Sequence, residues 1–187
     1  NALNVLSNHP NIDNENIAIT GWSLGGATTL FSAWMPIIKA IKPKNKFAAH
    51  LSYYPPCVAT PNNMTFSDVP IHILIGEIDD WTPANACVEF VDSMKKEGYD
   101  VGISIYENSH HSFDSELPIT YIENGYSLTD CSLKIRDDGA VLMNFLSIPM
   151  TSPFYQKIGL SLCADRGTTI GGNNKARIDA HEFSKSF

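Results

Sequence analysis

Short apolar runs alternate with stretches of helix-forming residues along most of this 187-residue chain. The apolar runs are rich in β-branched residues and are bounded by turn-forming residues, which is typical of strands. Four strands are predicted in this way, at residues 17–20, 47–53, 70–76 and 101–106. The third is almost continuously apolar, as expected of a strand that a parallel sheet buries on both faces. Strands separated by helices predict an α/β fold with a mostly parallel sheet flanked by helices.

Proline and glycine mark the ends of the predicted helices. The helices are predicted at residues 24–35, at 84–97, at 153–166, and from the turn at 171–173 to the C-terminus. Pro36 is expected to end the first of them. Thr82 and Pro83 supply an N-cap and a first-turn proline to the second, and Gly98 follows its last residue.

Residues 115–150 interrupt the alternation of strands and helices. They contain turn signals at Asn124-Gly125 and at 137–139, with short β-like pieces around them. We interpret this segment as an insertion that lies over the sheet or beside the site. The first six residues have the pattern of the last turns of a helix, and the chain does not begin with methionine. Residues 1–187 are therefore interpreted as the C-terminal portion of a single α/β domain, from a processed chain or a fragment.

The composition is 43% hydrophobic and 18% charged, which suits a soluble globular protein and not a disordered one. A net charge of −7 argues against a nucleic acid or an anionic membrane as a partner. No apolar run reaches the length of a membrane span. We therefore expect neither a nucleic-acid partner nor a membrane partner.

The four cysteines are widely separated in the chain, at positions 57, 87, 131 and 163. None lies in a CxxC pair or at zinc-finger spacing, so no metal site is predicted. An even number is compatible with two disulfides and hence with a periplasmic or secreted protein. The pairs Cys57–Cys87 and Cys131–Cys163 are preferred, because the partners of each pair lie near one another in the predicted layout. Four free thiols in a cytoplasmic enzyme are the alternative.

The first candidate for chemistry is the segment Gly21-Trp22-Ser23-Leu24-Gly25, a Gly-x-Ser-x-Gly motif. It follows a predicted strand and opens a predicted helix, which is the context in which such a serine becomes a nucleophile. The turn is tight, so we expect side chains at Gly21 or Gly25 to collide with the backbone that presents Ser23. The Leu24 N–H at the helix N-terminus is a candidate donor to a developing oxyanion. A glycine-rich turn with a surface serine is the alternative.

A serine nucleophile needs a base to accept its proton, and the base needs an acid to orient it. The acid is predicted in segment 76–83, directly after the buried third strand. A carboxylate there lies at the carboxyl edge of the parallel sheet, where chemistry is found in such folds. Asp79 is the preferred acid, with Asp80 and Glu77 as alternatives.

The base is predicted in segment 108–114, which follows the fourth strand. His111 is preferred, and the adjacent His110 is the alternative. His50 and His72 lie inside predicted strands and are interpreted as core histidines. The resulting chain order of serine, acid and histidine is that of α/β-hydrolases.

Four segments together carry a resemblance to a known family. They are Gly-Trp-Ser-Leu-Gly-Gly at 21–26, Tyr-Tyr-Pro-Pro-Cys at 53–57, Gly-Glu-Ile-Asp-Asp-Trp-Thr-Pro at 76–83 and His-His-Ser-Phe-Asp at 110–114. In these segments the chain resembles the dienelactone hydrolase family of α/β-hydrolases. The resemblance implies that Ser23 is the nucleophile, Asp79 the acid and His111 the base, and its His-x-Phe pattern favours His111 over His110. It implies hydrolysis of a small-molecule ester through an acyl-enzyme, with no metal or organic cofactor.

The chain departs from the family pattern in two respects. Founding members of the family have cysteine at the position of Ser23, so serine favours a broader esterase-like hydrolase over one dedicated to dienelactone. The family fold also has strands before the nucleophile strand, which would carry a second oxyanion N–H. We therefore expect an α/β-hydrolase fold that is incomplete on its N-terminal side, with an exposed sheet edge and with Leu24 as half of the oxyanion hole.

Two other functions fit parts of the pattern. A serine peptidase of the prolyl-oligopeptidase type shares a similar Gly-x-Ser-x-Gly-Gly motif, and a noncatalytic binding module could keep the motifs without the activity.

Four aromatic residues near the motifs are candidates for an acyl pocket: Trp22, Tyr53, Trp81 and Phe113. For at least two of them we expect ordinary core packing instead.

Overall fold

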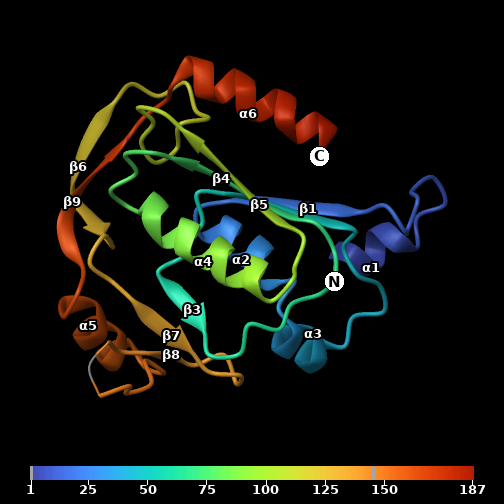
Figure 1. Ribbon diagram of the computed structural model, residues 1–187, viewed down its shortest axis with the longest axis horizontal. Helices are drawn as coiled ribbons and strands as arrows, with labels where there is room; N and C mark the ends of the chain where they lie inside the picture. Colours follow the sequence, from blue (N-terminus) through green and yellow to red (C-terminus); the bar gives the residue numbers. More distant parts are fainter. Residues whose placement is uncertain (1, 145) are drawn as a thin grey trace.

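The structure is a computed structural model that describes residues 2–144 and 146–187, and it is built on a parallel sheet (Figure 1). The sheet has four strands in the order β1-β2-β4-β5. They are β1 (Ala18–Trp22), β2 (Ala49–Tyr53), β4 (Ile71–Gly76) and β5 (Val101–Tyr106). All neighbouring pairs are parallel, so the four strands end at one edge of the sheet. The predicted α/β fold and its four strands are confirmed.

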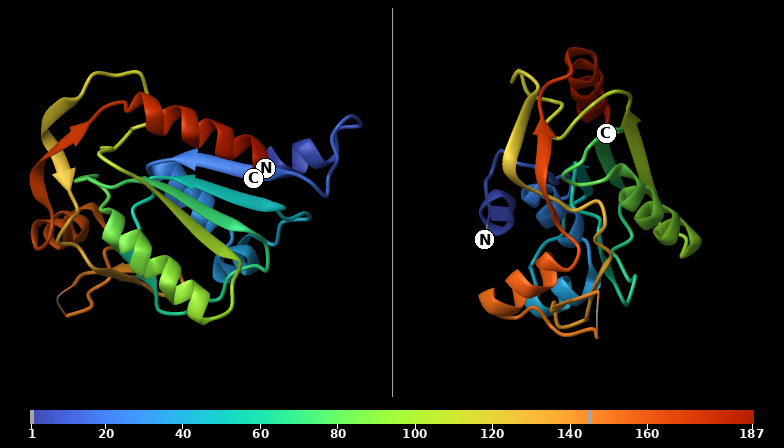
Figure 2. Two further views of the ribbon diagram at one scale, coloured as in Figure 1. Left: turned by 45° about the horizontal axis from the view of Figure 1, so that its top comes forward. Right: turned by 90° about the vertical axis from the view of Figure 1, so that its left-hand side faces the viewer.

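Helices cover both faces of the sheet (Figure 2). On one face lie α2 (Leu24–Phe31) and α4 (Ala84–Lys96), and on the other lies α6 (Asn174–Ser186). The central strand β4 is buried between them, with Ile73, Leu74 and Ile75 fully inaccessible to solvent. This burial on both faces explains why the strand is a nearly continuous apolar run.

Of the two histidines predicted for the core, His50 lies there and His72 lies at its edge. His50 is buried, and its Nδ1 lies 2.9 Å from the Thr29 carbonyl oxygen. His72 is half-buried, and its ring lies against Phe183 of α6. Burial lowers the pKa of both imidazoles because it disfavours their charged form.

The predicted helix at 24–35 is wrong beyond Phe31, where α2 ends. A separate helix, α3 (Met35–Ile41), begins after Trp34, so Pro36 lies in the first turn of a helix and does not end one. A proline is tolerated there because first-turn N–H groups have no partner within the helix. Buried Trp34 fixes the break, since its indole donates to the Asn63 carbonyl oxygen at 2.8 Å.

Small sheets are built by the residues after 114 together with β3 (Ala59–Pro61). Their strands are β6 (Thr120–Ser127), β7 (Leu133–Ile135), β8 (Val141–Leu142) and β9 (Asp165–Ile170). The strands β7 and β8 form a hairpin, whose connection contains the predicted turn at 137–139. The signal at Asn124-Gly125 is not a chain reversal: it falls inside β6, where the pairing with β9 shifts register.

The predicted helix from 153 to about 166 is also wrong at its end. Helix α5 covers Pro153–Ser161, and β9 begins at Asp165. The β-branched residues Thr168, Thr169 and Ile170 favour a strand, and β6 provides its partner. The interpretation of 115–150 as an insertion stays a prediction.

Both predicted cysteine pairs are confirmed as disulfides. Cys57–Cys87 joins the loop after β2 to α4, and Cys131–Cys163 joins the segment before β7 to the residues after α5. The chain begins with a helix, α1 (Ala2–Ser7), as its pattern predicted. In the described part of the chain, β1 is an edge strand and no helix has the length and apolar content to cross a bilayer.

Candidate active site

Three side chains from three strand ends meet at the carboxyl edge of the sheet. Ser23 follows β1, Asp79 follows β4 and His111 follows β5. His111 Nε2 lies 3.0 Å from Ser23 Oγ, and His111 Nδ1 lies 2.8 Å from Asp79 Oδ2. The arrangement is that of a nucleophile, a base and an orienting acid, each within hydrogen-bond reach of the next.

The Ser23 turn has an unusual backbone. Ser23 has φ 53° and ψ −117°, a left-handed conformation that few non-glycine residues adopt. Its N–H donates to the Tyr53 carbonyl oxygen at 3.0 Å, which ties the turn to β2. A residue held in such a conformation by its surroundings is typical of functional sites.

Glycine is required at two positions beside this turn, Gly21 and Gly26, whereas the prediction named Gly21 and Gly25. A Cβ at Gly21 would collide with the backbone of Gly25, as expected. A Cβ at Gly25 itself would meet open space, so the expected collision there is wrong. The crowded helical position is Gly26, where a Cβ would lie 2.6 Å from the Tyr53 carbonyl oxygen. The helix therefore approaches β2 through Gly26.

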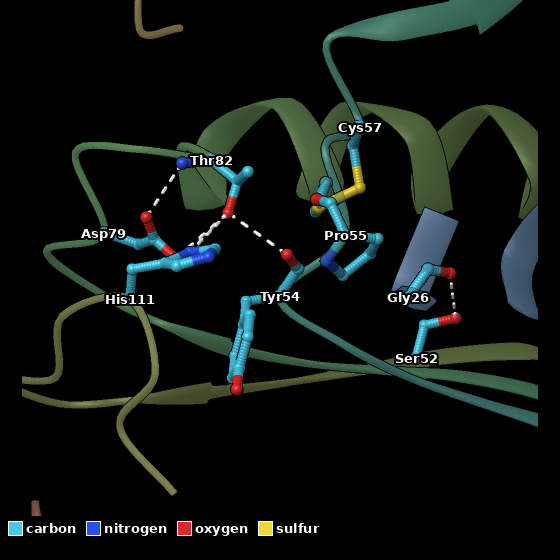
Figure 3. The surroundings of a disulfide bond; sticks show 9 residues. Gly26, Ser52, Tyr54, Pro55, Cys57, Asp79, Thr82 and His111 are labelled. Atoms are coloured by element: carbon cyan, nitrogen blue, oxygen red, sulfur yellow. Dashed lines mark hydrogen bonds and ion pairs between the residues drawn. A yellow bond between two sulfur atoms is a disulfide. The ribbon is translucent and has the colours of Figure 1, made fainter. Parts of the chain in front are cut away.

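Asp79 is buried, and Thr82 and His111 lie beside its carboxylate (Figure 3). Oδ1 accepts the N–H groups of Trp81 at 2.9 Å and Thr82 at 2.8 Å. Oδ2 accepts the Thr82 hydroxyl at 3.0 Å and lies 2.8 Å from His111 Nδ1. A buried carboxylate needs such donors to keep its charge.

The role of Thr82 is missed by the sequence analysis. The N-cap of α4 is Pro83, and the Thr82 side chain does not cap the helix. Its hydroxyl lies 3.0 Å from Asp79 Oδ2, 3.2 Å from the Tyr54 carbonyl oxygen and 3.2 Å from His111 Nδ1. Threonine before proline is a helix-start signal in sequence. Thr82 is therefore interpreted as an N-cap from sequence alone, and its contact with Asp79 is not predicted.

The alternative acids and the alternative base have other partners. Asp80 Oδ1 accepts the Thr169 N–H at 2.8 Å, and Glu77 Oε2 accepts the Asn108 N–H at 2.9 Å. In the described part of the chain, His110 Nδ1 is buried without a hydrogen-bond partner. The structure thus brings His111, and not His110, to Ser23, and it brings Asp79, and not Asp80 or Glu77, to His111.

Aromatic rings surround the imidazole of His111, which is 4% exposed. The ring of Tyr54 lies 4.5 Å from it and the ring of Trp81 lies 5.2 Å from it, between centroids. Phe113 and Tyr53 are buried in the core, which confirms core packing for two of the four aromatic candidates. Trp22 is 45% exposed, and its place in an acyl pocket stays a prediction.

Leu24 is the first residue of α2, so its N–H lies at the positive end of the helix. Its role as an oxyanion donor stays a prediction. Among residues 2–144 and 146–187, no three His, Cys, Asp or Glu side chains are grouped as a metal site.

Comparison with known proteins gives a family match and structural neighbours. The model of the dienelactone hydrolase family matches residues 1–128. The dienelactone hydrolase-like promiscuous phosphotriesterase P91 from metagenomic libraries is 20% identical with a TM-score of 0.50, over 61% of this chain and 45% of that one. Esterase 2 of Thermogutta terrifontis is 18% identical with a TM-score of 0.50, over 60% of this chain and 53% of that one.

These neighbours share the fold, and this chain matches about half of their length. No curated protein matches it.

Proposed function

Because this chain belongs to the dienelactone hydrolase family, we propose that it acts as a serine hydrolase on carboxylic esters of small molecules. The observation that carries the proposal is the hydrogen-bonded series from Ser23 Oγ through His111 to buried Asp79. Such a series activates a hydroxyl that is otherwise a weak nucleophile at neutral pH. Serine at position 23 favours a broader esterase over a hydrolase dedicated to dienelactone.

In the first half of the reaction, Ser23 Oγ attacks the ester carbonyl carbon while His111 Nε2 accepts the hydroxyl proton. Asp79 keeps the Nδ1 proton of His111 in place and stabilises the imidazolium. The Leu24 N–H donates to the oxyanion of the tetrahedral intermediate. The intermediate collapses to an acyl-enzyme, and the leaving alkoxide takes the proton from His111.

In the second half, His111 Nε2 accepts a proton from water as the water oxygen attacks the acyl carbon. Collapse of this second intermediate releases the carboxylic acid, and the proton returns from His111 to Ser23 Oγ. The cycle consumes one ester and one water, and it needs no redox or metal step.

The disulfides Cys57–Cys87 and Cys131–Cys163 support a periplasmic or secreted location for this hydrolase. Such bonds persist in oxidising compartments and are rare in the cytoplasm of mesophiles.

Fluorophosphonate labelling with mass spectrometry tests the proposal, on this chain and on its longest natural form. We expect one adduct, on Ser23, and none in the Ser23→Ala variant. The Ser93→Ala variant, whose hydroxyl on α4 donates to the Glu89 carbonyl oxygen of its own helix at 2.8 Å, is the matched control and should label like the wild type. Absence of an adduct on both forms would contradict the proposal and favour a noncatalytic binding module.

Hydrolysis of p-nitrophenyl acetate and of a proline p-nitroanilide separates an esterase from a peptidase of the prolyl-oligopeptidase type. We expect turnover of the ester alone. If only the longest natural form turns over, a second oxyanion donor outside this chain completes the site, since one donor contributes about 10²–10³ in rate.

A further inference from the structure

Asp114 lies three residues after His111 and joins the loops of the candidate site. Its two carboxylate oxygens accept hydrogen bonds from two different strand ends. Trp22 Nε1 donates to Oδ2 at 2.6 Å, and the Tyr54 hydroxyl donates to Oδ1 at 2.7 Å. The donors are 92 and 60 residues away in the chain, so these contacts exist only in the folded molecule.

The hydrogen bond to Trp22 joins the same two segments of the chain as the hydrogen bond between Ser23 and His111. Trp22 is the residue before Ser23, and Asp114 belongs to the loop of His111. Ser23 Oγ and His111 Nε2 lie 3.0 Å apart, and the loops that carry them are joined a second time by the 2.6 Å hydrogen bond from Trp22 to Asp114. A charged acceptor makes this second link stronger than a neutral pair would be.

The bond to Tyr54 acts on the imidazole through a ring contact. The Tyr54 ring lies 4.5 Å from the His111 ring, and the Tyr54 carbonyl oxygen lies 3.2 Å from the Thr82 hydroxyl beside Asp79. Burial, together with the negative charge of Asp114, raises the pKa of Tyr54, so the phenol stays protonated and donates. Asp114 thus fixes the ring that covers His111.

We propose that Asp114 is a positioning residue for the hydrolysis proposed above, holding His111 in line with Ser23 through Trp22 and Tyr54. This inference rests on the proposed function. Asp114 touches none of the reacting atoms, so its effect falls on geometry. Misplacement of a reacting group by about 1 Å lowers a rate by about 10²-fold.

The test compares p-nitrophenyl acetate hydrolysis by the wild type, four single variants and one double variant of the longest natural form. Asp114→Asn keeps the shape of the side chain but removes its charge and one acceptor. Trp22→Phe and Tyr54→Phe each remove one donor and keep an aromatic ring. Asp92→Asn, on the exposed face of α4, is the matched control for loss of a carboxylate.

We expect Asp114→Asn to lower kcat by about 10- to 100-fold with KM changed less than about threefold. Trp22→Phe and Tyr54→Phe should each lower kcat by a smaller factor. Adding Trp22→Phe to Asp114→Asn should cause little further loss, because both changes break the same link. Asp92→Asn should match the wild type.

An unchanged kcat in a folded Asp114→Asn variant of an active enzyme would overturn this inference and leave the proposed function standing. A change confined to KM would also overturn it, since Asp114 would then act in substrate binding. If Asp114→Asn does not fold, Trp22→Phe and Tyr54→Phe replace it in the test. An unchanged kcat in both of these variants would then overturn the inference. If the wild type and Asp92→Asn neither label nor hydrolyse esters, the proposed function fails, and this inference fails with it.

Discussion

The four-stranded sheet and the peripheral region at residues 115–170 are held together in different ways. The sheet packs into a large core whose central side chains, such as Ile73 and Phe113, are inaccessible to solvent. The peripheral region has a small apolar cluster of three buried residues, Leu133, Met143 and Met150. Its strand β6 is largely exposed, and its strand β9 is largely half-buried. Apolar burial therefore positions the sheet, whereas the peripheral region reaches the large core through buried Ile135 and otherwise depends on other contacts.

Those other contacts end on the loops that carry the candidate site. The Asp80 carboxylate accepts the Thr169 N–H, and the Asp80 carbonyl oxygen accepts the Ser127 hydroxyl, both at 2.8 Å. The His111 carbonyl oxygen accepts the Gly171 N–H at 3.0 Å. Adjacent residues thus contact different regions: Asp79 faces His111, and Asp80 faces the peripheral strands. One loop therefore contributes both to the candidate site and to the attachment of the peripheral region.

The largest expected effect is a difference in kcat between the amide variants of these two carboxylates. Asp79→Asn should lower kcat by about 10⁴-fold, because an amide favours the wrong tautomer of the histidine it orients. Asp80→Asn is the matched control, one residue away, and should lower kcat by less than about tenfold. Steady-state hydrolysis of p-nitrophenyl acetate measures both.

Limited proteolysis completes this comparison. Asp80→Asn should increase cleavage within residues 115–170, whereas Asp79→Asn should leave the pattern as in the wild type. Equal losses of kcat in the two variants would contradict the division of roles between Asp79 and Asp80.

The disulfides provide the next test, because they close loops of nearly equal length in the two regions. Their sequence separations are 30 and 32 residues. Chain entropy alone predicts that replacing either pair with serine costs about 3.5 kcal/mol. We expect the changes to act in different places: loss of Cys57–Cys87 lowers the free energy of unfolding of the whole sheet, and loss of Cys131–Cys163 opens the peripheral region first.

Urea unfolding followed by tryptophan fluorescence and by hydrogen exchange distinguishes these outcomes. All three tryptophans, at 22, 34 and 81, lie outside the peripheral region. A single cooperative transition with the same loss in both double variants would show that the two regions unfold as one.

The smallest expected effect is the pH dependence of the sheet. Burial lowers the pKa of His50 below its ordinary value of 6.5, so the native state stays neutral where the unfolded chain is already protonated. Stability should therefore be constant above about pH 6.5 and fall as the pH drops from there toward the native pKa. His72 acts in the same direction, and the peripheral region contains no histidine.

The free energy of unfolding at pH 7.5 and at pH 5.5 measures this effect. His50→Gln should lose less stability between the two values than the wild type does. His9→Gln, at an exposed position before β1, is the matched control and should lose as much as the wild type. If the wild type, His50→Gln and His9→Gln all lose the same free energy of unfolding between the two pH values, groups other than His50 cause the acid sensitivity.

Much of the sheet could be predicted from local patterns. The apolar run at 70–76, the helix that ends before Gly98 and the glycine-rich turn at Ser23 are each set by residues within one element. The break between α2 and α3 could not be predicted in this way. It depends on buried Trp34, whose indole reaches a carbonyl 29 residues away. The strand β9 likewise needs β6 as its partner.

Local sequence patterns predicted the fold class, and they indicated the preferred candidates Ser23, Asp79 and His111 and the preferred cysteine pairs. Periodicity and turn chemistry act over a few residues, and parallel strands bring their ends to one edge. The folded chain was needed to show that Asp79 and not Asp80 contacts His111, and that Asp114 accepts hydrogen bonds from Trp22 and Tyr54. Neighbouring loop residues point in different directions, and donors 60 and 92 residues away meet only after folding.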